Sequence, residues 1–169
     1  MEKIERELWL HDAMNRWECS LLRTCYAYLG DAALAEDAVQ ETFLKAWKGF
    51  GRFQGASEEK TWLMRIAINT CKDMRRSAWF RHTDRSLSLD NLPEGAEPFT
   101  VRDDTLTRAV MALKPKLREV VLLHWYQQLS GDETAKALGV PRSTVYNRLE
   151  KVRKLMRKEL EVWYREDGR

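Results

Sequence analysis

The residues of this sequence best suited to bind another molecule form a basic run near the C-terminus. Residues 142–158 carry seven bases and one acid, Glu150. Apolar residues recur through the same run at helical spacing: Val145, Leu149, Val152 and Met156. The run therefore predicts one helix that is buried along a stripe and basic elsewhere. Such a helix offers donors to the phosphates and base edges of DNA.

The polar residues of this predicted helix divide by position. Candidates for base contact stand near its N-terminus, where a helix approaches base edges closely: Arg142, Ser143, Thr144, Tyr146 and Asn147. Bases further along are better placed for phosphates: Arg148, Lys151 and Lys154. The alternative interpretation is an amphipathic helical hairpin whose basic face only contacts solvent.

The residues before this run predict a second helix and a sharp turn. Ser130 and Glu133 have the spacing of a capping box, which starts a helix. Gly139 can adopt the left-handed conformation that ends it, and Pro141 suits the start of the next helix. Small Ala135 would allow a close crossing, and the corner would be filled by Leu138, Val145 and Leu149. These features predict a helix-turn-helix.

Other kinds of chemistry find no support in the sequence. Three cysteines form no CxxC pair, so we expect buried, reduced thiols, and the three histidines are scattered. No nucleophile motif or phosphate-binding loop occurs, so we expect no enzyme, cofactor or metal site. The net charge is only +3, so a polyanion site must come from local sorting of charge. No apolar run is long enough to span a bilayer, and the N-terminus is acidic where a signal peptide would be basic. We expect a cytoplasmic protein.

The elements that position these residues read as helices. The first 90 or so residues contain no proline and show helical periodicity throughout. One stripe is expected to end near Gly30-Asp31, a stop followed by a cap: Ile4, Leu8, Met14, Trp17, Leu21 and Cys25. A second helix should bury Ala35, Val39, Phe43, Ala46, Trp47 and Phe50. In a third, the residues in register are Trp62, Ile66, Asn69 and Asp73.

The stretch 86–104 changes character. It carries five acids, one base and two prolines, so we expect a flexible acidic linker. Two further short helices should follow, the first of them stopped near Lys114-Pro115. The predicted fold class is all-α, with two small helical domains at 1–85 and 105–169 and a helix-turn-helix in the second.

Both halves together resemble the extracytoplasmic-function (ECF) group of the sigma-70 family, the promoter-specificity subunits of bacterial RNA polymerase. The most specific stretch is "LGDAALAEDAVQETFLKAW" followed by "TWLMRIAINTCKDMRR". It is similar to the family's second domain, where an Asp-x-x-Gln-Glu-x-Phe helix precedes a Trp-Leu-x-x-Ile-Ala-x-Asn helix. The stretches "ALKPKLREVVLLHW" and "LSGDETAKALGVPRSTVYNRLEKVRKLMRKEL" are similar to its fourth domain.

The resemblance implies a set of partners. They are core RNA polymerase, through the clamp coiled coil of its largest subunit and the flap of the second, promoter DNA, and in many members an anti-sigma factor. The resemblance implies that the coiled coil is bound by Glu36, Asp37, Gln40, Glu41, Leu44, Lys45 and Trp47. The alternative for Glu36 and Asp37 is an ordinary solvated face. We expect a monomer when free, and association with the nucleoid when in holoenzyme.

The third predicted helix and the loop before it match the part of the family that melts and reads the minus-ten element. The residues that this match implies are Phe53, Gln54, Lys60, Trp62, Arg65, Asn69, Lys72, Arg75 and Arg76. The loop from Phe53 to Lys60 corresponds to the pocket for an unpaired base, which aromatic stacking and positive charge would hold. Trp62 reads either as core or as a base-stacking residue. Asn69 should either satisfy a buried group or read a base.

The chain departs from the family pattern at three places. Ala56-Ser57-Glu58-Glu59-Lys60 stands where Asp-Ser-x-Phe-Tyr is frequent, so two acids replace aromatics. Ser143 and Tyr146 replace a frequent glycine and a frequent base, and Thr134 stands where isoleucine is usual. Two alternatives to a sigma factor remain: a stand-alone helix-turn-helix regulator with an N-terminal dimerisation or sensing domain, and a helical scaffold.

Overall fold

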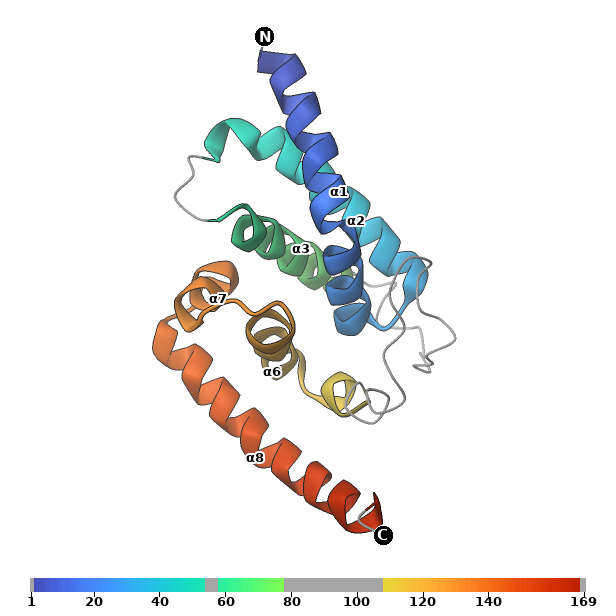
Figure 1. Cartoon of the computed structure of the whole chain (residues 1–169), viewed down its shortest axis with the longest axis vertical. Helices are drawn as coiled ribbons and strands as arrows, with labels where there is room; N and C mark the ends of the chain where they lie inside the picture. The colour runs from blue at the N-terminus through green and yellow to red at the C-terminus, as the bar shows by residue number, and fades with distance from the viewer. Residues whose placement is uncertain (1, 54–57, 78–107, 168–169) are drawn as a thin grey trace.

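The computed structural model describes residues 2–53, 58–77 and 108–167. Within these ranges the elements are helices, and no strand occurs among them. The helices form two domains, the second with a helix-turn-helix (Figure 1), which confirms the predicted fold class. The linker predicted at 86–104 lies outside the described residues. None of the helices described combines the length and apolar character needed to cross a membrane.

The N-terminal domain consists of α1 (Glu2–Leu29), α2 (Ala32–Gly49), the single 3-10 turn η1 (Phe50–Arg52) and α3 (Glu59–Arg76). The three α-helices contact one another. Gly30, in the left-handed region at φ 72°, follows the end of α1, and Asp31 caps α2 by accepting a 2.8 Å bond from the N–H of Leu34. The stop and the cap predicted at this pair are confirmed.

The predicted stripe of α1 is correct only in its C-terminal half. Leu21 and Cys25 are fully buried, whereas Ile4 and Leu8 are about two-thirds exposed, at 63% and 64%. Because successive helical residues turn by about 100°, Ile4 and Leu8 lie on the side opposite Ala13, which is fully buried. The first turns of α1 also extend past the other helices (Figure 1). Few neighbours are therefore available there to cover an apolar side chain.

The inner face predicted for α2 is confirmed, and the face predicted for α3 is wrong. Ala35, Val39, Phe43 and Ala46 are buried, with Trp47 and Phe50 partly so. In α3 the core residues are Leu63, Met64, Ala67, Ile68 and Cys71. The predicted register, from Trp62 to Asp73, falls on the opposite side of α3, where Trp62 and Ile66 are half-buried and Asn69 and Asp73 are exposed.

The C-terminal domain begins in the described residues with a helical turn at 108–112. Next come α6 (Pro115–Val120), the π-helix η3 (Val121–Tyr126), α7 (Gly131–Leu138) and α8 (Arg142–Asp167). The sequence predicted one regular helix where α6 and η3 stand. The π-helix ends near Gln128, which has a positive φ of 57° and is the only non-glycine residue described with one.

The helix-turn-helix agrees with its prediction. The Ser130 hydroxyl accepts from the N–H of Glu133 at 3.1 Å, and the Glu133 carboxylate accepts from the N–H of Ser130 at 2.7 Å. Gly139 closes α7 at φ 65°. The corner and the stripe of α8 are buried as expected: Ala135, Leu138, Val145, Leu149, Val152 and Met156.

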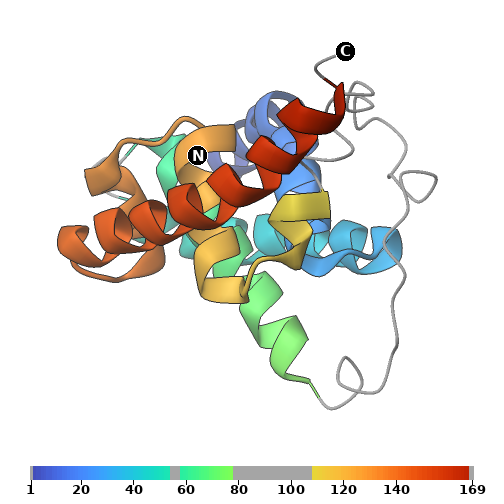
Figure 2. The ribbon, with the colours of Figure 1, turned by 90° about the horizontal axis from the view of Figure 1, so that it is seen from below.

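The two domains contact each other, chiefly through α3 and α7. The Gln127 side chain donates to the Thr24 hydroxyl at 2.8 Å and to the Ser20 carbonyl at 3.2 Å. Arg118 donates to the Tyr28 carbonyl at 2.6 Å. The helix α8 lies on the outer side of the C-terminal domain, far from the N-terminus (Figure 1). In the view from below it is the helix nearest to the viewer (Figure 2). We call this arrangement, in which the two domains are in contact, the closed arrangement. It leaves one side of α8 open to solvent.

Candidate nucleic-acid interface

The first turns of α8 present the predicted base-contacting residues to solvent. Arg142, Ser143 and Asn147 are exposed, Thr144 is half-exposed and Tyr146 is 44% exposed. The Arg142 guanidinium lies 5.3 Å from the centre of the Tyr146 ring and pairs with Asp132 at 3.4 Å. These side chains come from neighbouring turns of one rigid helix, which suits insertion into a groove.

The Tyr146 ring rests directly on α7. A Cβ placed on Gly131 would lie 2.5 Å from the Tyr146 hydroxyl and 2.8 Å from its Cζ atom, closer than van der Waals contact permits. Residue 131 must therefore be glycine if the ring is to keep this place. This contact fixes the direction of a side chain that is both a candidate for base contact and a departure from the family pattern.

Arg148, predicted to bind phosphate, is turned toward Glu119 of α6, at the edge of the C-terminal domain that meets the other domain. Its Nη1 lies 2.8 Å from Oε1 of Glu119, and its side chain is only 16% exposed. The second oxygen of Glu119 lies 3.0 Å from Nζ of Lys72, on α3. We call these three residues the Glu119 junction. The carboxylate is 3% exposed, so the buried charge is balanced by one cation from each domain.

A cavity of about 370 Å³ adjoins the Glu119 junction. Its lining combines the basic edges of both domains: Tyr28, Lys72, Arg75, Arg76, Pro115, Lys116, Glu119, Val140 and Arg148. Burial, followed by the nearby Glu119 charge, raises the pKa of Tyr28 above its ordinary value. Five cations therefore face one carboxylate, and the contact between the two domains brings like charges close together.

The remaining minus-ten candidates on α3 are more open to solvent. Arg65, Asn69 and Arg76 are exposed, and Arg75 is half-buried. Since Asn69 is not buried, the expectation that it satisfies a buried group is wrong, and reading a base remains its predicted role. Gln54 lies outside the described residues.

Aromatic rings gather where the loop of residues 53–60 meets the domain. Phe53 stacks on Trp62 with ring centres 4.8 Å apart and planes at 27°. Trp9, from α1, lies 4.8 Å from Phe50 and 5.9 Å from Trp62. We call these four rings the aromatic cluster. Trp62 is thus half-buried among rings, and its stacking on a base stays a prediction.

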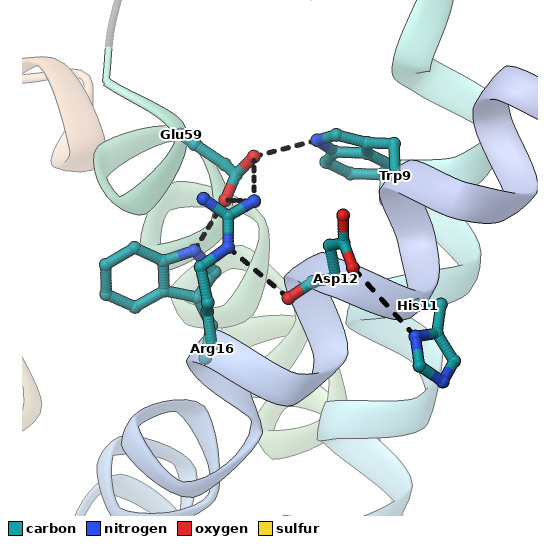
Figure 3. A network of polar contacts seen from close by, with 6 residues as sticks. Trp9, His11, Asp12, Arg16 and Glu59 are labelled. Carbon is teal, nitrogen blue, oxygen red and sulfur yellow. Dashed lines mark hydrogen bonds and ion pairs between the residues drawn. The ribbon is translucent and has the colours of Figure 1, made fainter.

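Two charged residues at the start of α3 bind other parts of the molecule. The Lys60 ammonium donates to the backbone carbonyl of Gln127, in the other domain, and lies 5.8 Å from the centre of the Trp17 ring. The Glu59 carboxylate accepts from the indole N–H groups of Trp9 and Trp17, at 2.8 and 2.6 Å (Figure 3). It also pairs with Arg16 at 3.1 Å.

The polymerase-binding residues implied by the resemblance lie on α2. Glu36, Asp37, Gln40 and Glu41 are exposed, and Leu44 is 53% exposed. The other two members of the set, Lys45 and Trp47, are half-buried. An acidic surface that includes an exposed leucine suits a helix-on-helix interface. This face of α2 is open even though the two domains are in contact.

The C-terminal domain contains another surface that could bind a partner, an apolar groove of about 1240 Å³. Leu155, 51% exposed, stands in it beside apolar residues of the 108–117 segment. Cations surround it: Arg108, Lys114, Lys116, Arg148, Lys151 and Lys158. No acidic residue lines the groove within the described part of the chain.

Sequence reasoning missed several residues that hold the domains together. Glu119 is one, and Arg118 is another: its guanidinium donates to the carbonyls of Tyr28, Met111 and Leu113. Burial, and then the charge of Arg75, lowers the pKa of Arg118 to about 10. One signal in the sequence could have found both residues. Arg118 and Glu119 directly precede the apolar run from Val120 to Leu123, and a charge that is buried beside such a run needs a partner.

The thiols agree with expectation in two cases of three. Cys25 and Cys71 are buried and reduced, whereas Cys19 is exposed. A hydrogen bond with the Cys25 thiol and then burial raise the pKa of Cys71 well above its usual value, so it stays protonated. No cluster of potential metal ligands occurs among the residues that the structure describes.

Comparison with known proteins agrees with this geometry. Residues 14–81 match the family model for sigma-70 region 2, and residues 103–156 match that for sigma-70 region 4. The ECF RNA polymerase sigma factor SigL of Mycobacterium tuberculosis is 35% identical over 152 residues, covering 85% of this chain and 81% of the relative. The RNA polymerase sigma-H factor of Pseudomonas aeruginosa is 28% identical over 165 residues, covering 89% and 86%. The solved sigma factor RpoE of Bartonella quintana, bound to the anti-sigma factor NepR, superposes with a TM-score of 0.67 at 22% identity, covering 96% and 99%.

Proposed function

Because this chain belongs to the sigma-70 family, as an ECF factor that directs promoter-specific transcription initiation, we propose roles for its individual surfaces. The N-terminal turns of α8 read the minus-thirty-five element in the major groove, through Arg142, Ser143, Tyr146 and Asn147. The basic edge of α3 and the loop of residues 53–60 hold melted minus-ten DNA. What supports this is the exposure of the first set and the aromatic cluster beside the second.

Sigma factors bind core RNA polymerase, and we assign that contact to two surfaces of this chain. The acidic face of α2, centred on Gln40 and Leu44, docks on the clamp coiled coil of the largest subunit. The groove beside Leu155 receives an apolar segment from the flap of the second subunit. Exposed apolar residues rimmed by charge support both assignments.

The observation that carries this proposal is that the two kinds of surface differ in availability. The α2 face is open, whereas Lys72 and Lys60 are bound across the domain contact, and Arg148 shares the carboxylate of Glu119 with Lys72. Polymerase can therefore engage α2 first. Separation of the domains then frees Lys72 and Lys60 for phosphate, and the five-cation cavity favours separation because its like charges repel.

The alternatives weighed from the sequence are not favoured. A stand-alone regulator or a scaffold has no use for a region 2 domain, yet both sigma regions match in order. We propose that the free chain is a cytoplasmic monomer that joins the nucleoid within holoenzyme and needs no cofactor. An anti-sigma partner would act by holding the closed arrangement, in which the same cations are occupied.

Transcription from a defined promoter by purified core enzyme tests these assignments. Core plus this chain should give a discrete start site, and Gln40→Ala with Leu44→Ala should abolish it while DNA binding by the free chain is kept. A matched control is Glu18→Ala, an exposed position on α1 outside every proposed surface. Full transcription by the α2 variant would refute the assignment of that face.

A further inference from the structure

Glu58 and Glu59, the two acids in the stretch that departs from the family pattern, have different surroundings. Glu58 is exposed, and its side chain forms no capping bond with the helix that follows. Glu59 points inward, between two indole rings of α1, and is 17% exposed (Figure 3). The second acid is therefore not an exposed charge at the mouth of the loop. It belongs to the contact between α1 and α3.

Each oxygen of Glu59 is used. Oε2 accepts from Trp9 at 2.8 Å and Oε1 from Trp17 at 2.6 Å, while Arg16 lies 3.1 Å from Oε1. The Arg16 guanidinium is itself held by the backbone carbonyl of Asp12 at 3.3 Å. Hydrogen bonds to a charged acceptor are short and directional. They fix the carboxylate, and with it the first residue of α3, relative to two turns of α1.

The same bonds extend to the aromatic cluster. Trp9, held by Glu59, contacts both Phe50 and Trp62, and Phe53 stacks on Trp62. Trp17, the other ring held by Glu59, lies below the Lys60 ammonium. The rings that Glu59 holds therefore reach two candidate residues for minus-ten DNA: Phe53 through Trp62, and Lys60 through Trp17.

We propose that Glu59 is a positioning residue for promoter melting. It fixes the stacked pair of Phe53 and Trp62, and the Lys60 ammonium, so that an unpaired minus-ten base meets a preformed platform. A base stacks more tightly on a ring that need not be ordered first. Arg16 balances the Glu59 charge, so the site presents no net negative charge to the phosphates. This inference rests on the proposed assignment of the loop to minus-ten DNA.

A binding comparison separates this role from general packing. The chain in complex with core polymerase is titrated with a fluorescent single-stranded minus-ten oligonucleotide, and with versions carrying one abasic position each. For the wild type, loss of the captured base should weaken binding about tenfold, as expected for one base stacked on an aromatic ring. For Glu59→Ala this discrimination should fall to about twofold or less. Affinity for core polymerase and for minus-thirty-five duplex should stay unchanged.

Milder variants serve if Glu59→Ala does not fold. Trp17→Phe keeps a ring but removes one donor, and Glu59→Gln keeps one acceptor oxygen; both should give intermediate discrimination, about threefold to fivefold. The matched control is Asp12→Ala, which removes an acid from the same region but leaves the backbone carbonyl that holds Arg16 (Figure 3). Asp12→Ala should lose as much affinity for the abasic oligonucleotide as the wild type does.

The outcomes are distinguishable. Wild-type discrimination retained by Glu59→Ala, or by both milder variants if it does not fold, overturns the positioning role and leaves the loop assignment standing. A wild type that binds abasic and intact oligonucleotides equally refutes the loop assignment itself, and the positioning role with it.

Discussion

Arg148 and Lys72 lie in different domains and bind the same buried carboxylate, that of Glu119, at 2.8 and 3.0 Å. Each of the two cations belongs to a surface proposed to bind promoter DNA. While the junction is intact, neither cation is available to a phosphate. The domain contact and DNA binding are therefore linked through one side chain, and ligands that favour one oppose the other.

Replacing Glu119 should favour the open arrangement. In Glu119→Gln, the two cations lose their shared charge and move into solvent, which they already partly contact. We expect the free energy of unfolding to fall by about 1–3 kcal/mol, below the usual loss for a fully buried pair. We expect the free chain to bind minus-thirty-five duplex about five times more tightly, since about 1 kcal/mol shifts an equilibrium by that factor. Fluorescence anisotropy at low salt measures the affinity.

The control for this variant is Asp132→Asn. It also removes an acid paired with an arginine of α8, but at the surface, where such a pair contributes little. A rise of less than about twofold is expected there. Equal rises for the two variants would attribute the effect to net charge and contradict the role of the junction.

The contact residues of α8 should separate by type of loss. In a Glu119→Gln background, where Arg148 is released from its carboxylate, Arg148→Ala should weaken binding to specific and random DNA alike and reduce the slope of log K against log salt by about 0.9. Asn147→Ala should instead change base preference in the minus-thirty-five element, by about 1–3 kcal/mol at one position. Competition binding with a set of single-base variants measures both. Parallel losses on every sequence for both variants would refute the division.

Gly131→Ala should displace the Tyr146 ring. The new Cβ would meet the hydroxyl at 2.5 Å, so the ring must turn away from α7 and from Arg142. We expect affinity for the minus-thirty-five element to fall by about 1 kcal/mol, the scale of one exposed cation–ring contact. In a Tyr146→Ala background the same glycine change should have no further effect on DNA binding, and an additive loss there would contradict the proposed cause.

The capping box of α7 should make part of the stability depend on pH. The Ser130 N–H and then its hydroxyl lower the pKa of Glu133 below the ordinary carboxyl value. A carboxylate with a lowered folded-state pKa stabilises fully above its unfolded pKa and loses that effect as pH falls through the folded one. Glu133→Gln should thus cost about 0.5–1 kcal/mol at pH 7, the usual scale for a helix cap, and about nothing near pH 2. Urea unfolding at both pH values measures the difference, and an equal cost at both would contradict the charged cap.

Local signals in the sequence were sufficient to predict the helix-turn-helix. Ser130, Glu133 and Gly139 act through hydrogen bonds and backbone angles within a few residues, so their pattern can be read directly. The register of α3 could not be read in the same way. It is contacted by α1, α2 and α7 on several sides, so apolar residues occur all around it and the period alone does not identify the core face.

The contacts between residues distant in the chain were beyond sequence reasoning for a different reason. Glu119 binds residues 29 and 47 positions away in the chain, Arg148 and Lys72, and no local pattern encodes such a pairing. Glu59 similarly bonds to Trp17 across 42 positions. The sequence could indicate only that a charge beside an apolar run needs a partner. Which partner it has follows from how the helices pack.

We propose that polymerase docking on α2 separates the two domains and so frees Lys72 from the Glu119 junction and Lys60 from the Gln127 carbonyl. Fluorescence energy transfer between the exposed Cys19 and a cysteine at the exposed position 136 (Lys136→Cys) measures the separation of the domains directly. We expect high transfer in the free chain, a marked loss on addition of core polymerase, and reduced transfer without polymerase in Glu119→Gln. Transfer that stays the same when core enzyme is bound would contradict this proposal.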